Sequence, residues 1–243
     1  MDCSLFDQIY VINLDRSDDR RKHIIREFER VGISIDNYIF FPAVDANGPV
    51  VRDILNNKGR QKLPDGSVRI WRNLNKYQIG NWSSYIGVWE DIIKNNYDIC
   101  LLCEDDIKFA EYYKPVIDTI FNYEYLLQQG IDPARPLVIG VGSGYQDFVH
   151  KAREETNLVK DKPIGGRDCN PCHIINKSMA VELLKHSKCI QQASDPYIHN
   201  VIGPRHQRYW VVPQPIYELS WNACVKKYPS TIEGPLGKGD KLS

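Results

Sequence analysis

The sequence predicts an α/β fold in which a mostly parallel central sheet is flanked by helices. The first 45 residues read as strand, helix and strand, and further strand-like runs alternate with amphipathic helical segments along the chain. Parallel strands need a crossover connection, so this order favours a parallel sheet. The three acids that end one of these strands, and the arginines just past the first strand, predict a binding site at the carboxyl ends of the strands.

The opening β-α-β unit has clear local signals. Residues 8–14 are rich in β-branched and aromatic side chains, as in a buried strand. Ser17 followed by two aspartates is a typical helix start, and Gly32 ends the helical spacing. A short strand at 38–41 then runs into a loop at 42–48.

The remaining elements follow from the same patterns. Residues 47–75 are polar and predict a loop with a short helix, and apolar spacing through 79–93 predicts a long amphipathic helix. The later expected elements are strands at 98–103, 137–141, 171–175 and 209–212, and helices at 112–128, 177–187 and 195–202. Residues 142–168 lose periodicity and are expected to form a mobile lid or acceptor loop. The chain reads as one domain over 1–243, with a core at about 8–216 and an irregular tail at 218–243.

Composition and charge exclude several classes of protein. Of the 243 residues, 42% are hydrophobic, and Lys+Arg and Asp+Glu are both 31. The net charge of zero disfavours an electrostatic nucleic-acid binder. No apolar run reaches the roughly 18–20 residues of a membrane span, and the acidic start is unlike a secretory signal, so we expect a soluble protein made in the cytosol.

Seven scattered cysteines fit reduced thiols better than a disulfide framework. Cys100 and Cys103 lie in a strand-like run, where alternation points them to opposite faces. Cys169, Cys172 and His173 leave structural zinc as an alternative to buried thiols.

Three consecutive acids, Glu104, Asp105 and Asp106, end a buried apolar strand. Strand alternation places the first and third on one side, where two carboxylates form a hard-oxygen site suited to Mg²⁺ or Mn²⁺. The alternative is a helix start or a solvated turn.

The first strand ends with Asn13 and Leu14 and is followed by Asp15 and Arg16, with Arg20 further along. Arginines beside a helix N-terminus are suited to a phosphate group. The alternative is a set of solvated helix charges paired with the neighbouring aspartates. The chain contains no P-loop and no GxSxG or HExxH motif.

Asp195 lies between Ser194 and Pro196 at an expected helix start. A helix N-cap is one interpretation, and a general base at the mouth of the site is the other.

Taken in order, these segments resemble glycosyltransferase family 25, which includes lipooligosaccharide galactosyltransferases and collagen glycosyltransferase domains. The resemblance is carried by Ile9–Arg20, Phe41–Ala46, Gln78–Trp89, Leu101–Asp106, Cys172–Leu184, Ser194–Ile198 and Pro213–Ile216. Two positions depart from the family pattern: Gln78 stands where the family has Glu, and Tyr85 where it has His.

The resemblance implies a GT-A-like, Rossmann-like domain that transfers a hexose from a nucleotide sugar, usually a UDP-sugar, with inversion. It implies a glycan or protein acceptor and a divalent cation, Mn²⁺ or Mg²⁺, held by Glu104 and Asp106. Asp195 would be the catalytic base. The residues expected around the nucleotide sugar are Asn13, Leu14, Arg16, Arg20, Asp45, Ser84, Tyr85 and Asp105. Two other functions stay open: a catalytically silent nucleotide-sugar-binding homologue, and an unrelated metal-dependent hydrolase or nucleotidyltransferase.

Overall fold

The computed structural model describes residues 2–144, 157–160 and 171–220. It is a mixed α/β fold built on a seven-stranded sheet with the order β2-β1-β5-β10-β7-β12-β9. In this sheet β10 is antiparallel to β5 and β7, and β9 is antiparallel to β12, while the other neighbours are parallel. The predicted fold class is confirmed. The strands of this sheet are β1 (Gln8–Asn13), β2 (Tyr38–Pro42), β5 (Ile99–Glu104), β7 (Leu137–Gly140), β9 (Asn157–Val159), β10 (Cys172–Asn176) and β12 (Gln207–Val212).

Two layers of helices cover the sheet, because its strands alternate apolar side chains between the two faces. Ile9 and Val11 pack towards α1, α4 and α5, whereas Tyr10 and Ile12 pack towards α3 and α7. The helical elements are α1 (Asp18–Val31), η1 (Ile35–Asn37), α2 (Pro49–Asn56), α3 (Lys76–Asn95), α4 (Tyr113–Ile120), α5 (Tyr123–Gln128), α7 (Lys177–His186), α8 (Ser194–Pro196), η2 (Tyr197–Ile202) and η3 (Gly203–Arg205).

Local signals explain the ends of the main helices. Gly32 adopts the left-handed conformation that ends α1. Asn75 and Gln78 form a reciprocal capping box at the start of α3, with each side chain bonded to the other residue's backbone N–H. The helix predicted at 112–128 is instead two helices, because Asn122 caps a new start at Tyr123.

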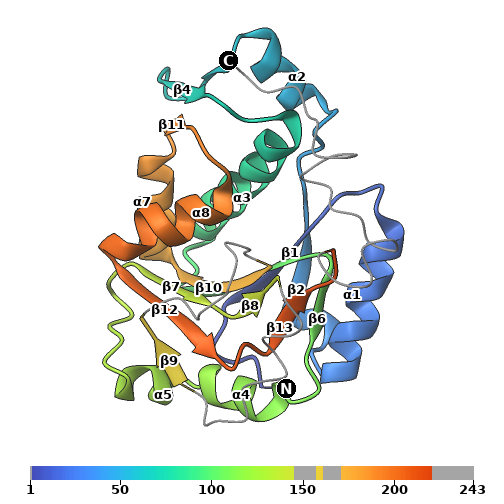
Figure 1. Cartoon of the computed structure of the whole chain (residues 1–243), viewed down its shortest axis with the longest axis vertical. Coiled ribbons are helices and arrows are strands. Elements are labelled where there is room, and N and C mark those ends of the chain that lie inside the picture. Colours follow the sequence, from blue (N-terminus) through green and yellow to red (C-terminus); the bar gives the residue numbers. More distant parts are fainter. Residues whose placement is uncertain (1, 145–156, 161–170, 221–243) are drawn as a thin grey trace.

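Two small sheets complete the described fold. One has the order β11-β4-β3, and the other β6-β13-β8. Their strands are β3 (Arg60–Lys62), β4 (Val68–Trp71), β6 (Ile107–Phe109), β8 (Gly142–Ser143), β11 (Cys189–Ile190) and β13 (Ile216–Glu218). Figure 1 shows α2, β4 and β11 at the upper end of the molecule, with α3 running from there towards the large sheet.

Some predicted elements differ from the structure. Residues 47–75 hold the β3–β4 hairpin in addition to the expected short helix, and β12 is followed by a further strand, β13. The predicted lid at 142–168 lies mostly outside the described residues, although its described parts form β8 and β9. The predicted irregular tail lies outside them from residue 221 onward.

Candidate functional site

The candidate site lies where three parallel strands end. Asn13 ends β1 and Glu104 ends β5, while Asp45 follows the end of β2. Because β2, β1 and β5 are parallel neighbours, their carboxyl ends lie at one edge of the sheet. Ligands of open α/β sheets bind at this edge.

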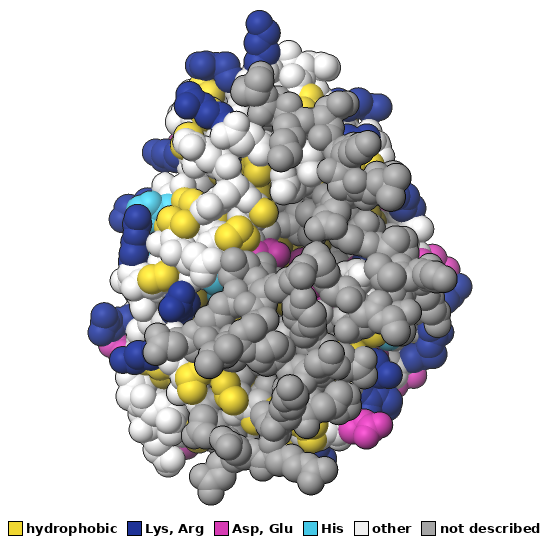
Figure 2. Space-filling view, viewed as in Figure 1, with side chains coloured by type: hydrophobic (Ala, Val, Ile, Leu, Met, Phe, Trp, Pro, Cys, Tyr) yellow, Lys and Arg dark blue, Asp and Glu magenta, His cyan; other side chains and the backbone are white. Residues whose placement is uncertain are grey.

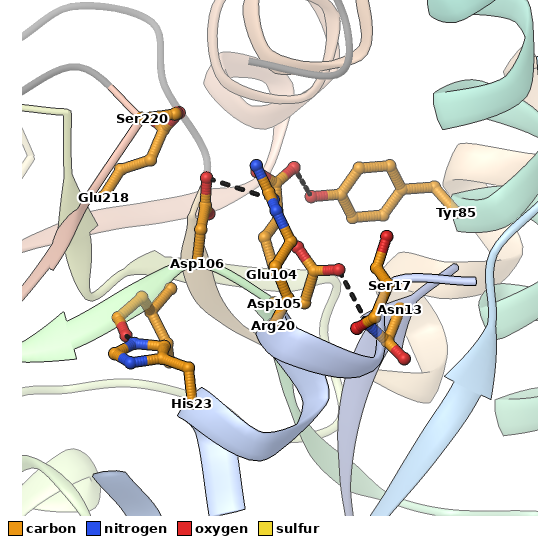
Figure 3. A network of polar contacts seen from close by, with 11 residues as sticks. Asn13, Ser17, Arg20, His23, Tyr85, Glu104, Asp105, Asp106, Glu218 and Ser220 are labelled. Carbon is orange, nitrogen blue, oxygen red and sulfur yellow. Dashed lines mark hydrogen bonds and ion pairs between the residues drawn. The ribbon is translucent and has the colours of Figure 1, made fainter. Parts of the chain in front are cut away.

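Three carboxylates converge there. One oxygen from each of Glu104, Asp106 and Glu218 lies within 4.8 Å of the others. The chain turns tightly after β5 into β6, and β13 pairs with β6 so that Glu218 lies opposite Ile107. The Leu219 N–H donates to the Asp106 carbonyl at 2.9 Å, which holds the two segments together. Figure 3 shows these side chains with Ser220, whose hydroxyl donates to Glu218. This set of three carboxylates is called the acidic cluster below.

Asp105 points away from the acidic cluster, towards β1 and α1. It accepts hydrogen bonds from Asn13 Nδ2 at 2.8 Å and from Arg20 Nη1 at 2.6 Å. The same Arg20 nitrogen lies 3.4 Å from Asp106 Oδ2, and all of these side chains are buried. The alternative in which Arg20 pairs with the neighbouring helix aspartates is therefore wrong. In this structure Arg20 holds the turn after β5 in place through its contacts with Asp105 and Asp106.

The positive charge near the acidic cluster does not fully compensate the negative charge of its three carboxylates. Burial, with the charges of Asp195 and Glu218, raises the pKa of Glu104 well above its usual range. Burial raises the pKa of Asp106 to about 6 despite the opposing effect of Arg20, and burial with Asp106 raises that of Glu218 to about 8. Like charges that raise one another's pKa favour either bound protons or a bound cation.

The acidic cluster fits a divalent cation. Carboxylate oxygens are ligands that Mg²⁺ and Mn²⁺ prefer. Asp106 Oδ1 is buried and has no hydrogen-bond partner among the described residues, although a buried carboxylate oxygen normally has one. A cation at this position would satisfy that oxygen and compensate the charge.

Tyr85 forms the wall of the acidic cluster on the α3 side. Its hydroxyl donates to Glu104 Oε1 at 3.1 Å, and its ring lies 5.8 Å from that of His173. Burial and the Glu104 and Asp195 charges raise the pKa of the Tyr85 phenol well above 10. The phenol therefore stays protonated and remains a donor to Glu104.

Asp195 lies on α8, and Ser194 beside it contacts Asn81 of α3. The Asp195 charge raises the pKa of Glu104, Tyr85 and Glu218, which places it within electrostatic reach of all three. The cap position of α8 is Ala193, and Asp195 lies inside the first turn, so the N-cap interpretation is wrong. The single Ser194 hydroxyl proton has two acceptors within reach, Asn81 Oδ1 at 2.6 Å and Asp195 Oδ1 at 3.0 Å.

The other residues expected at the nucleotide shape the loop after β2. Arg16 forms an ion pair with Asp45, and both are partly exposed. Ser84 Oγ accepts from the Val44 N–H and donates to the Gly80 carbonyl, both at 2.8 Å, so it holds this loop against α3. A Cβ atom at Gly80 would lie 2.7 Å from the Val44 carbonyl oxygen, so this contact needs glycine. Leu14 is half-buried beside this loop.

The sequence reasoning missed Glu218, which it assigned to the start of an irregular tail. The sequence nevertheless contains a signal for Glu218. The short apolar stretch 215–217 is followed directly by this acid, as the apolar strand before Glu104 is followed by that one. Only the pairing of β13 with β6 shows that these two acids meet.

The zinc alternative is not supported by the described residues. The Cys172 and Cys103 Sγ atoms lie 3.3 Å apart in one face of the core, whereas His173 faces Tyr85 on the other. Adjacent residues of one strand point to opposite faces, so Cys172 and His173 do not converge on one ion. Cys169 lies outside the described residues. Cys100 and Cys103 point to opposite faces, as predicted.

Among the described residues, no helix combines the length and apolar character needed to cross a bilayer.

Similarity to known proteins covers just under half of the chain in each of the following relatives. A glycosyltransferase 25 family member from Aedes aegypti is 34% identical over 107 residues, 44% of this chain and 17% of that protein. Procollagen galactosyltransferase 1-A of Xenopus laevis is 27% identical over 120 residues, 48% of this chain and 19% of that protein. The human inactive glycosyltransferase 25 family member 3 is 29% identical over 124 residues, also 48% of this chain and 19% of that protein. The matches thus span less than a fifth of these relatives.

The family model described as glycosyltransferase family 25 (LPS biosynthesis protein) matches residues 6–134. This range holds β1, β2, α3 and β5, and with them the acids that end β5 and the Asn13, Arg20 and Tyr85 side chains around them. Asp195 and Glu218 lie beyond it. Because the match covers more than half of the chain and includes the strand ends that form the candidate site, the chain belongs to glycosyltransferase family 25.

Proposed function

We propose that this protein transfers a hexose from a nucleotide sugar, a UDP-sugar, to a hydroxyl group of a glycan or protein acceptor, with inversion at the anomeric carbon. The observation that carries the proposal is the convergence of Glu104, Asp106 and Glu218 at the carboxyl edge of the sheet, with Asp195 within electrostatic reach. Family membership supports glycosyl transfer as the reaction class.

The acidic cluster would hold Mn²⁺ or Mg²⁺. When bound, the cation would supply positive charge to the leaving diphosphate. Arg20 and Asn13 keep the turn that carries the acids in place through Asp105. Tyr85 donates to one oxygen of Glu104 and thereby orients this carboxylate.

Asp195 would act as the general base. In an inverting displacement, the acceptor oxygen bonds to the anomeric carbon while the bond from that carbon to the diphosphate oxygen breaks. The acceptor hydroxyl proton then needs a carboxylate on the side opposite the leaving group. The Ser194 hydroxyl would orient Asp195 when it donates to Oδ1.

The test measures UDP binding, and the release of UDP from UDP-galactose and UDP-glucose with and without an acceptor, both in Mn²⁺ and in a chelator. Asp106→Asn is compared with Asp118→Asn, which removes an exposed acid of α4. We expect the first variant to lose Mn²⁺-dependent UDP binding and the second to behave like wild type. Wild-type UDP affinity that is the same in Mn²⁺ and in chelator, or an unchanged Mn²⁺-dependent UDP affinity in Asp106→Asn, would contradict the metal role. Donor binding without any UDP release would indicate a silent homologue, and acceptor-independent release at full rate a hydrolase.

A further inference from the structure

The small sheet β11-β4-β3 has one buried and one exposed face. Arg69, Trp71 and Ile190 are buried on its inner side. The register places Arg60 opposite Ile70 and Lys62 opposite Val68, so these four side chains share the outer face. Arg60 and Lys62 are exposed, and Val68 is 39% exposed. This outer face, with Cys189 beside Ile70, is called the basic face below.

The basic face belongs to the most positively charged part of the chain. Residues 49–76 contain seven cations and two acids, although the whole chain has no net charge. The seven cations are Arg52, Lys58, Arg60, Lys62, Arg69, Arg72 and Lys76. Figure 2 shows Lys and Arg side chains around this upper end of the molecule, while the Asp and Glu side chains visible in that view lie lower.

The two acids of this segment do not neutralise the basic face. Asp53 accepts from the Asn57 side chain at 3.0 Å, and Asp65 accepts from the Ser67 N–H and hydroxyl at 2.9 and 2.7 Å. Within the described part of the chain, neither Arg60 nor Lys62 has a carboxylate within ion-pair distance. Their charges are therefore available to a partner.

The surface chemistry favours an acidic polypeptide as that partner. The basic face presents cations and the aliphatic side chains of Val68 and Ile70, whereas the aromatic side chain of Trp71 is buried on the inner side. Binding of single-stranded nucleic acid relies on stacking against aromatic side chains, and interfacial membrane binding on larger apolar groups. A peptide needs neither, and β3 at the sheet edge offers a strand against which a peptide can lie.

The basic face is connected directly to the candidate base. The chain leaves β11 at Ile190 and reaches Asp195 in α8, and the Gln192 carbonyl in between accepts from Trp82 Nε1 at 2.9 Å. The six residue steps from Cys189 to Asp195 span at most about 22 Å. A peptide bound on the basic face would therefore lie within a few residues of the reacting hydroxyl.

We propose that the basic face is an acceptor-docking surface that binds an acidic segment of a protein acceptor a few residues from the glycosylated hydroxyl. The docking role rests on the proposed function, but the peptide binding that it predicts can be measured without sugar transfer.

The test measures binding of a fluorescein-labelled peptide of alternating glutamate and alanine to the full chain by fluorescence anisotropy. Arg60→Gln/Lys62→Gln is compared with Lys94→Gln/Lys108→Gln, which removes two exposed cations elsewhere. We expect the first pair to weaken binding by about 2- to 30-fold, the combined value of two exposed charge contacts, and the second to leave it unchanged. Binding should also weaken as salt rises.

Equal peptide affinity for wild type and Arg60→Gln/Lys62→Gln would overturn the proposal, as would an equal loss in the control pair. Polygalacturonate, duplex DNA and phosphatidylserine vesicles form the comparison arms. Tighter binding of any of these through the same two cations would overturn the assignment to an acidic peptide. Mn²⁺-dependent UDP binding, measured on the same variants, reports the donor site separately, so failure of the proposed function is distinguishable from failure of this inference.

Discussion

The acidic cluster and the basic face use charge in opposite ways. The acids are mostly buried, lie within 4.8 Å of one another, and raise one another's pKa. The cations of the basic face are exposed and have no ion-pair partner among the described residues. Burying like charges destabilises a fold, whereas solvated surface charges have little effect on it. On the two proposals, the acidic cluster would hold a ligand at a cost in stability, whereas the basic face would bind a partner at almost none.

The largest expected effect is on turnover, at Asp195. Asp195→Asn keeps the shape of the side chain and removes the proton acceptor, so we expect transfer to the acceptor to fall by about 10²–10⁴. Melting temperature and donor binding should stay near those of wild type. Turnover within a few-fold of wild type would assign Asp195 a structural role in α8 and place the base elsewhere.

The second prediction separates stability from ligand binding within the acidic cluster. Glu218→Gln removes one of three mutually repelling carboxylates, so it should weaken Mn²⁺-dependent UDP binding by about 10-fold or more, by analogy with the loss of supporting groups in metal sites. The same variant should raise the melting temperature of the metal-free protein by a few degrees, since each kcal/mol corresponds to about 2–4 °C at this size. Calorimetry without metal, followed by UDP titration with Mn²⁺, measures both. A lower melting temperature would show that the Glu218 side chain stabilises the fold instead of destabilising it through repulsion.

The third prediction concerns pH. Asp106 and Glu218 have pKa values raised to about 6 and about 8, so the folded protein holds protons there that the unfolded chain has released. Stability of the metal-free protein should therefore fall as pH rises from about 5 to about 8. Mn²⁺ competes with these protons, so its affinity should rise over the same range. Thermal melts and Mn²⁺ titrations at pH 5.5, 7 and 8.5 test both directions, and metal affinity independent of pH would contradict the assignment of these carboxylates as ligands.

The smallest expected effect is on the basic face. Arg60→Gln/Lys62→Gln should change the free energy of unfolding by no more than about 0.5 kcal/mol, as is usual for exposed positions. Chemical denaturation of this variant beside Glu218→Gln compares the two regions directly. A large destabilisation by Arg60→Gln/Lys62→Gln would mean that these two cations stabilise the small sheet and have a structural role.

The sequence predicts the large sheet better than the small ones. β1, α1, β2, α3 and β5 follow from apolar spacing and cap residues, because each is long enough for a period to be recognised. The strands β3, β11 and β13 span only two or three residues, which is too short to show a hydrophobic repeat. They form because they pair with neighbouring strands. The site divides in the same way: Glu104 and Asp106 follow from a strand end, whereas Glu218 depends on tertiary pairing. The partners of Arg20 likewise lie far away in the chain and are visible only in the structure.

The docking of β13 has a consequence for the order in which the molecule assembles. Glu104 and Asp106 lie in the first half of the sequence, but Glu218 reaches them only when β13 pairs with β6 and β8. Contacts between such distant segments close late, because the loop between them must first lose its entropy. The repulsion within the acidic cluster is therefore complete only once β13 has docked. A divalent cation that binds the completed acidic cluster would stabilise the docked β13. Retention of the ion would therefore indicate that β13 has docked.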